Sequence, residues 1–135
     1  MLNLSSQSDY GILFITSLIN KVDYVPLSEL VHETKLPRRF LARIAAELVK
    51  NGLVVSREGK IGGYKLTRKV NHISLYDYLK IFEKKLNLVK CNDPQYHCPW
   101  DKLCQHRNFL SQTVSDIVID ELRKRKFNEL LYAHS

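Results

Sequence analysis

The three cysteines of this chain, Cys91, Cys98 and Cys104, all fall within 14 consecutive residues. An odd number of thiols cannot close into a complete set of disulfides, so we expect free thiols in a reducing environment. The same segment contains side chains that could act as further ligands: Asp93, His97, Asp101 and His106. Because few apolar residues are present to bury the thiols, convergence on a metal is favoured over packing in a core.

The gaps between the cysteines, six and five residues, bear on the kind of metal. Structural zinc prefers cysteines paired at short spacing, whereas wider gaps suit an iron–sulfur cluster. Three thiolates leave one ligand position of the cluster for a weaker oxygen or imidazole donor. The ligand at that position is then exchangeable, which suits a sensor. Two alternatives stay open: a cluster-free protein whose thiols respond by oxidation, and a zinc-stabilised one.

The positive charge of the chain is concentrated in one stretch. The net charge is +7, yet the segment from Lys35 to Lys69 carries ten basic residues and only two acidic ones, Glu47 and Glu58. Residues 91–135 are neutral, with six charges of each sign. A basic segment of this kind attracts polyanions and gains free energy by releasing counterions from DNA or RNA. The local pattern then decides between a solvated face and a nucleic-acid site.

Apolar periodicity predicts three helices in the first 52 residues. The first covers residues 8–20, and a short second helix opens after Pro26. Pro37 suits the first turn of a third helix, and the Asn51-Gly52 pair supplies the left-handed residue that ends it.

The rest of the chain predicts a hairpin and two further helices. Two β-prone runs, 53–56 and 64–67, flank a glycine-rich basic connection. Ser74 is a plausible start of a helix, residues 88–105 show no period and are expected to form a loop, and a final helix runs from about Arg107.

These elements in this order predict a winged helix-turn-helix fold, mainly α with a small β-hairpin wing and a long C-terminal dimerisation helix. We expect a DNA-binding domain over 1–86, a cysteine-rich cluster-binding loop over 87–106, and a dimerisation helix with a tail over 107–135.

Basic residues fall on the elements that would meet DNA. The N-terminal residues of a recognition helix contact base edges, and arginine is the commonest reader of guanine. A basic wing can reach phosphates or the adjacent minor groove, and Gly62 and Gly63 let its backbone turn tightly. The predicted DNA contacts are Ser28, Arg38, Arg39, Arg43, Arg57, Lys60, Tyr64 and Lys65.

The chain resembles the bacterial Rrf-two family of transcriptional regulators, which includes iron–sulfur regulators of the IscR type and nitric-oxide sensors of the NsrR type. The motifs that carry the resemblance are Lys50-Asn51-Gly52-Leu53-Val54, Gly62-Gly63-Tyr64-x-Leu66 and the three-cysteine loop. The resemblance covers nearly the whole chain. It implies a homodimer formed by crossing the long C-terminal helices, a near-palindromic double-stranded DNA operator, and a cluster near the dimer interface whose loss or modification changes DNA affinity.

The resemblance also implies the ligands. Cys91, Cys98 and Cys104 match the three thiolates. Asp9 stands where the nitric-oxide sensor has a carboxylate ligand contributed by the other protomer, and it favours a [4Fe–4S] over a [2Fe–2S] cluster. His106 is the alternative fourth ligand, although it falls one residue before the histidine position of the iron–sulfur regulator. The competing role for Asp9 is an N-terminal helix cap.

One DNA-reading position departs from the family. Where the iron–sulfur regulator has a wing arginine that enters the minor groove, this chain has Glu58, so Arg57 or Lys60 would have to substitute. The operator sequence therefore cannot be borrowed from the relative.

Other classes of protein fit the sequence less well. The chain has no Cys-x-x-Cys pair, no nucleotide-binding glycine motif and no cluster of acid–base groups, so we do not expect an enzyme. It has no signal-peptide pattern and no apolar run long enough to span a bilayer. We therefore expect a cytoplasmic transcriptional regulator, a repressor in the simplest case, with no membrane partner.

Overall fold

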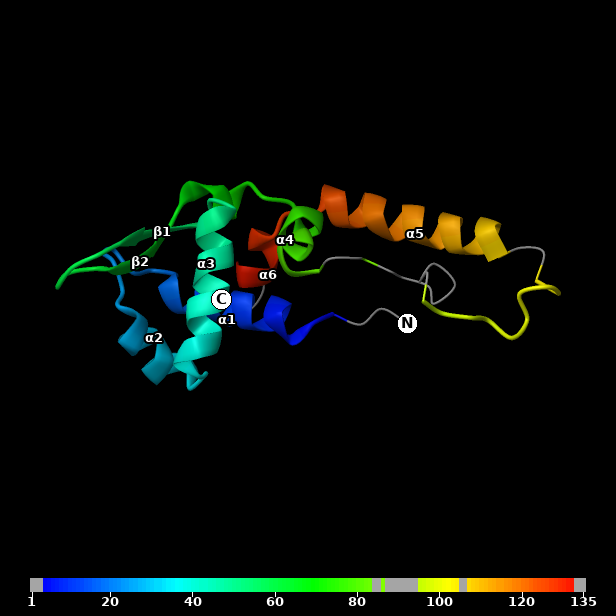
Figure 1. Cartoon of the computed structure of the whole chain (residues 1–135). Helices are drawn as coiled ribbons and strands as arrows, with labels where there is room; N and C mark the ends of the chain where they lie inside the picture. Colours follow the sequence, from blue (N-terminus) through cyan, green and yellow to red (C-terminus); the bar gives the residue numbers. More distant parts are fainter. Residues whose placement is uncertain (1–3, 84–85, 87–94, 105–106, 133–135) are drawn as a thin grey trace.

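In the computed structural model, which describes residues 4–83, 86, 95–104 and 107–132, three helices and a hairpin form the first part of the chain (Figure 1). They are α1 (Ser6–Leu18), α2 (Leu27–Thr34), α3 (Arg38–Lys50), β1 (Val54–Arg57) and β2 (Gly63–Leu66). The remaining elements are the short 3₁₀ helix η1 (Arg68–Asn71), α4 (Leu75–Phe82), α5 (Arg107–Lys124) and α6 (Asn128–Tyr132). The predicted fold class, mainly helical with a small β-hairpin, is confirmed.

Local signals end α3 and begin α4 where the sequence predicts. The Asn51 side-chain amide donates to the Glu47 carbonyl at 2.8 Å, and Gly52 takes φ +78°, a conformation that glycine adopts without strain. Ser74 caps α4 because its hydroxyl oxygen accepts a hydrogen bond from the Asp77 N–H at 3.0 Å. The C-terminal end of α3 and the N-terminal end of α4 are therefore fixed by local hydrogen bonds.

The hairpin is held to the helices through its second strand. The strands pair antiparallel with Ser56 opposite Tyr64. The Tyr64 backbone exchanges two hydrogen bonds with Val25, at 2.8 and 2.9 Å, which fastens the hairpin to the segment before α2. Gly63, at φ +142°, makes this approach possible, because a Cβ there would overlap the Val25 carbonyl oxygen.

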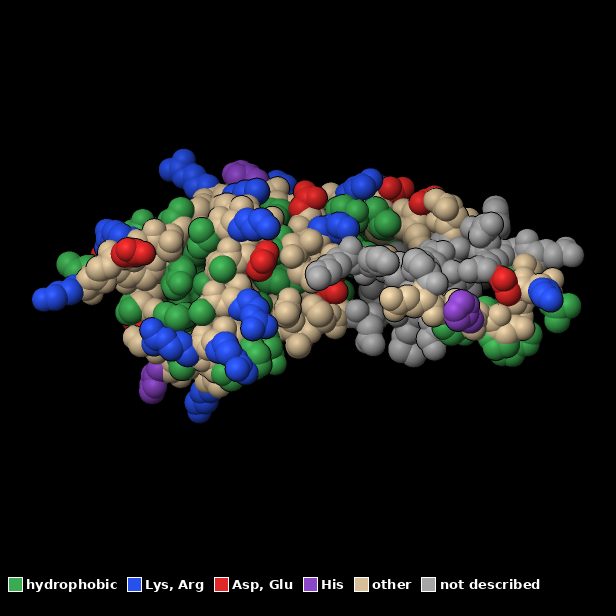
Figure 2. All heavy atoms as spheres, in the orientation of Figure 1, with side chains coloured by type: hydrophobic (Ala, Val, Ile, Leu, Met, Phe, Trp, Pro, Cys, Tyr) green, Lys and Arg blue, Asp and Glu red, His purple; other side chains and the backbone are tan. Residues whose placement is uncertain are grey.

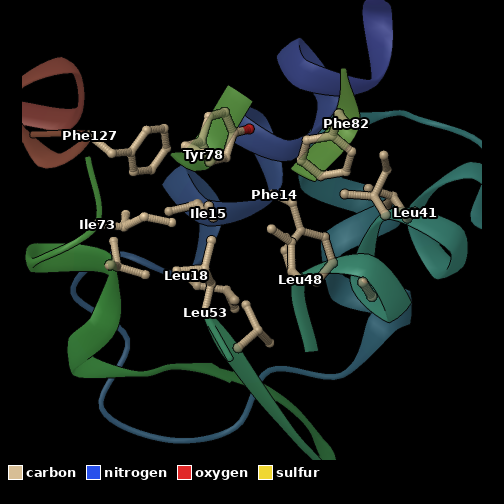
Figure 3. Packing of buried hydrophobic residues seen from close by; sticks show 14 of the residues in the cluster. Phe14, Ile15, Leu18, Leu41, Leu48, Leu53, Ile73, Tyr78, Phe82 and Phe127 are labelled. Carbon is tan, nitrogen blue, oxygen red and sulfur yellow. The ribbon is translucent and has the colours of Figure 1, made fainter. Parts of the chain in front are cut away.

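One hydrophobic core joins α1, α2, α3, α4 and the hairpin (Figure 3). α1 contributes Phe14 and Ile15, both fully buried, and α4 contributes Tyr78. The packing of α1 on α4 is close at Gly11, where a Cβ would stand 2.5 Å from the Tyr78 hydroxyl oxygen. A larger side chain at Gly11 would push these two helices apart.

The C-terminal part of the chain leaves this core and then returns to it. α5 extends away from the helical unit (Figure 1). After α5, Phe127 is fully buried and stacks on Tyr78 with ring centroids 3.9 Å apart. Its N–H donates to the Ile73 carbonyl at 3.0 Å, and the Leu75 N–H donates to the Arg125 carbonyl at 2.8 Å.

The sequence predicts neither this return nor α6. The core formed with residues 1–86 thus includes a side chain from beyond residue 107, and the three-part division of the chain stays a prediction. None of the helices in the described part of the chain combines the length and apolar character that crossing a membrane requires.

Candidate DNA-binding face and cysteine segment

α3 separates an apolar face from a basic one. The side chains buried in the core recur at helical spacing: Leu41, Ile44, Ala45 and Leu48. The exposed side chains lie on the opposite face and include no acidic residue: Arg38, Arg39, Ala42, Arg43, Ala46 and Lys50. The two alanines among the four cations have short side chains. The helix backbone can therefore come close to a surface that carries negative charge.

A short turn sets the angle of α3 against α2. Lys35 takes a left-handed conformation at φ 60°, and its N–H donates to the Val31 carbonyl at 2.8 Å. The Thr34 hydroxyl donates to the Leu30 carbonyl at 2.7 Å and accepts from the Leu36 N–H at 3.3 Å. This turn joins the two helices of the predicted helix-turn-helix and leaves the basic face of α3 exposed. In Figure 2, Lys and Arg side chains gather over the left part of the molecule, where Figure 1 shows α2 and α3 in the same orientation.

A groove of about 410 Å³ lies between the start of α3 and the hairpin. Its walls include Leu27 at the start of α2, Arg38 at the start of α3, and Gly62 in the hairpin turn. Ser28 is exposed in the first turn of α2, where backbone N–H groups have no partner within the helix. The groove therefore brings a guanidinium and a helix N-terminus together, a combination that suits a phosphate of a nucleic-acid backbone.

The three predicted wing cations differ in their surroundings. Arg57 lies 4.1 Å over the Tyr24 ring and 3.7 Å from the Asp23 carboxylate. The Lys65 ammonium lies 5.9 Å from the centroid of the same Tyr24 ring. Lys60 is exposed at the tip of the hairpin. Arg57 and Lys65 therefore help to fix the wing against the segment before α2, whereas Lys60 projects from it.

Tyr64, also predicted to contact DNA, packs against the core. Its ring meets the Phe14 ring edge-on, with centroids 5.5 Å apart. Its side chain is half-buried. The position stabilises the hairpin on α1, and the contact of Tyr64 with DNA stays a prediction.

The structure describes two of the three cysteines. Cys98 and Cys104 are half-buried free thiols. A turn brings their backbones into one compact segment, because the Cys104 N–H donates to the Trp100 carbonyl at 2.9 Å and the Asp101 N–H donates to the Cys98 carbonyl at 3.3 Å. Cys91 and His106 lie outside the described residues. Among the described residues, no three His, Cys, Asp or Glu side chains form a group that could hold a metal ion.

Asp9 is the fourth residue of α1 and is exposed. Ser5 occupies the N-cap position of this helix, so Asp9 does not act as the cap. Burial, together with the nearby Asp9 carboxylate, raises the pKa of Tyr78 above its ordinary value. The Tyr78 hydroxyl stays protonated and donates to the Ser8 carbonyl at 2.7 Å, which ties this turn of α1 to α4.

Glu83, which no local sequence motif marks, fastens the start of α1 to the end of α4. Its carboxylate is 9% exposed and accepts hydrogen bonds from the Ser5 N–H at 2.6 Å and the Ser8 hydroxyl at 2.8 Å. Burial acts to raise the pKa of Glu83, but these hydrogen bonds outweigh it and lower the pKa below its ordinary value. The carboxylate thus satisfies free donors at the N-terminus of α1, just before the cysteine segment begins.

Replacing Glu83 by glutamine is expected to lower the free energy of unfolding by about 1.5–3 kcal/mol at neutral pH, because charge-assisted hydrogen bonds to a buried carboxylate are lost. A carboxylate whose pKa is lowered by folding stabilises the protein above its unfolded-state pKa, and this stabilisation disappears as the pH falls through the folded-state pKa. Urea unfolding is measured for both proteins at neutral pH and at decreasing pH below 4.5, the ordinary pKa of a glutamate. The difference in unfolding free energy between the wild type and Glu83→Gln should shrink as the pH falls.

The exposed Glu58 offers a matched control, and Glu58→Gln should change stability little at either pH. A Glu83→Gln variant with the same unfolding free energy as the wild type at neutral pH would contradict the role assigned to this carboxylate.

The chain matches the Rrf2 family, described as iron-dependent transcriptional regulators, over residues 4–133. It is 32% identical over 124 residues to a candidate HTH-type transcriptional regulator of Aquifex aeolicus, covering 81% of this chain and 86% of that protein. It is 24% identical to NsrR of Bacillus licheniformis, covering 84% of this chain and 82% of that one. It is also 24% identical to IscR of Pectobacterium atrosepticum, covering 96% of this chain and 79% of that one.

Solved structures support the same fold. CymR, the global cysteine regulator of B. subtilis, has a TM-score of 0.74 at 21% identity and covers all of both chains. IscR of T. potens has a TM-score of 0.65 at 21% identity, covering 99% of this chain and 89% of that one. The matched family consists of transcriptional regulators and not of enzymes, in agreement with the sequence analysis. The chain therefore belongs to the Rrf2 family of transcriptional regulators.

Proposed function

We propose that this regulator binds a near-palindromic DNA operator as a homodimer and acts as a repressor whose operator affinity is controlled by an iron–sulfur cluster. The observation that carries the DNA-binding part is the exposed face of α3, where cations surround two alanines. Arginine can read guanine through two hydrogen bonds, alanine can contact a thymine methyl group, and lysine neutralises a phosphate. This face enters the major groove while the hairpin contacts the adjacent backbone.

Arg39→Ala is expected to weaken specific DNA binding by about 1–3 kcal/mol if this side chain reads a base. Arg39 lies on the exposed face of α3, with its guanidinium 5.4 Å from the Phe40 ring centroid. The measurement is a titration at several salt concentrations, on DNA that the wild-type protein selects from a random pool.

The Arg68→Ala variant removes the same charge from an exposed position in η1, outside α3 and the hairpin, and should bind almost normally. Equal weakening by both variants, on all DNA sequences alike, would mean that Arg39 contributes only a general positive charge.

The proposed homodimer would form along α5. Val114, Ile117 and Val118 follow each other at helical spacing, and Ile117 is 63% exposed. A helix that extends away from its own core with apolar side chains exposed gains free energy when a second copy covers them. Two copies joined in this way would present two α3 helices, as a near-palindromic operator requires.

The proposed cluster would be held by Cys91, Cys98 and Cys104, with Asp9 in preference to His106 as the fourth ligand. Supporting this, both described thiols are free and half-buried, and Asp9 is exposed and is not a helix cap. Thiolates are the usual ligands of iron–sulfur clusters, and a [4Fe–4S] cluster with one oxygen ligand would supply reactivity towards nitric oxide, oxidants or iron depletion. The protein's own part would be to hold these ligands, the three thiolates from one protomer and Asp9 from the other.

The cluster part is tested by purifying the protein without oxygen, recording its visible spectrum and counting iron and acid-labile sulfide per chain. We expect absorbance at about 400–460 nm and an amount of acid-labile sulfide that matches the iron. Colourless protein that iron and sulfide cannot reconstitute would contradict the cluster.

A cluster-free thiol switch is the second candidate, because Cys98 and Cys104 are unpaired and accessible. A colourless protein whose DNA affinity changes on oxidation would support it. Stoichiometric zinc without sulfide would support a zinc-stabilised regulator instead.

A further inference from the structure

Ile61 is a highly exposed apolar side chain at the tip of the hairpin. Its side chain is 74% exposed, between the exposed Lys60 and the buried Gly62. Ile61 is not among the residues that the sequence predicts to contact DNA. Yet it lies in the connection between β1 and β2, in the element that the proposed function places against the nucleic acid.

The backbone of this tip is held in one shape. Arg57 donates two hydrogen bonds to the Ile61 carbonyl, at 2.6 Å from Nη2 and 3.2 Å from Nε. The same guanidinium is fixed over the Tyr24 ring. The Gly62 N–H donates to the Gly59 carbonyl at 3.1 Å, and a Cβ at Gly62 would overlap the Arg57 carbonyl oxygen. The protein therefore presents Ile61 on a braced turn and loses little conformational entropy when the tip binds.

We propose that Ile61 is a specificity-determining residue that enters the minor groove and wedges against a base step, with Lys60 on the flanking phosphates. An apolar side chain beside a cation is the combination that proteins insert at deformable steps, since the cation is attracted to the groove and the apolar group replaces lost stacking. Arg57 positions the tip instead of reading the groove. This inference rests on the proposed DNA binding.

The consequence is a preference for pyrimidine–purine steps under the wing. These steps unstack at a lower free-energy cost than the steps of a stiff A-tract. Specificity would then arise at a position where the protein makes no base hydrogen bond. Such readout differs from that of Arg39 on α3, because it depends on the deformability of the DNA.

The test uses DNA selected from a random pool by the full-length protein, with the segment under the wing located by hydroxyl-radical footprinting. Duplexes that differ only in that step, TA against AA, are titrated with wild type, Ile61→Ala and Ile61→Leu. We expect the wild type to prefer TA by about tenfold, Ile61→Ala to lose this preference, and Ile61→Leu to retain it. The dependence of affinity on salt should be unchanged in all three proteins, because no charge is altered.

Val22→Ala is the matched control, since Val22 is also highly exposed, at 88%, but lies outside the hairpin. It should keep the wild-type preference. An Ile61→Ala protein that still prefers TA, or that weakens on both duplexes equally, would overturn the wedge while leaving DNA binding intact. A wild-type protein that selects no DNA at all would overturn the proposed function and the wedge together.

Discussion

Replacing Cys98 by alanine is expected to abolish retention of the iron–sulfur cluster while leaving the chain folded. The thiol is one of three proposed thiolate ligands, and removing one leaves too few sulfur donors to hold a cluster of this kind. The described part of the cysteine segment contributes no side chain to the hydrophobic core, so the fold should not depend on Cys98. The visible spectrum and the iron content of the anaerobically purified variant, beside its circular dichroism, measure both effects.

Leu103→Ala is the matched control for this experiment. Leu103 lies in the same segment, is highly exposed and offers no ligand atom, so this variant should keep the full visible absorbance. A Cys98→Ala protein with wild-type absorbance would show that the ligand assignment is wrong. A Leu103→Ala protein that also loses its colour would point to damage to the segment as a whole.

Phe127→Ala is expected to lower the free energy of unfolding by about 3–5 kcal/mol, because it removes a fully buried ring and leaves a cavity. The ring stacks on Tyr78, and the backbone of Phe127 is bonded to Ile73. The loss of stability would affect the helical unit that carries the proposed DNA-binding face, although Phe127 lies far from that unit in the sequence. Urea unfolding of the wild type and the variant measures the difference.

Leu130→Ala provides the comparison for this effect, since Leu130 lies in α6 and is about half exposed. It should cost less than about 1 kcal/mol. If Phe127→Ala cost no more than Leu130→Ala, the return of the C-terminal segment to the core would not stabilise the protein as described.

The helices and the hairpin of the first half of the chain follow from local signals. The cap at Ser74, the Asn51-Gly52 pair and the β-prone runs that flank the glycine-rich connection of the hairpin each act within a few residues, so the sequence alone identifies them. The burial of Phe127 depends on residues about 50 positions earlier in the chain, among them Tyr78. No local period marks a side chain of this kind, and α6 was missed for the same reason.

In the candidate site, too, some features follow from local signals and others depend on contacts between distant parts of the chain. The exposed positions of Arg38, Arg39 and Arg43 agree with the helical period of α3. The stacking of Arg57 on Tyr24 could not be predicted, because it joins a strand to a loop that precedes α2. Glu83 was missed because its partners lie 75 and 78 residues away, and only the packing of α1 on α4 brings them together.

Control of DNA binding by a cluster is tested by the DNA affinity of one protein preparation in two states. Anaerobically purified protein is titrated into its selected DNA at fixed salt, before and after a chelator removes iron, with Cys98→Ala treated in parallel. We expect removal of iron to change the dissociation constant of the wild type at least about tenfold, equal to about 1.4 kcal/mol, and to leave that of Cys98→Ala unchanged. A wild-type protein that loses its visible absorbance yet binds DNA with the same dissociation constant would contradict control by a cluster.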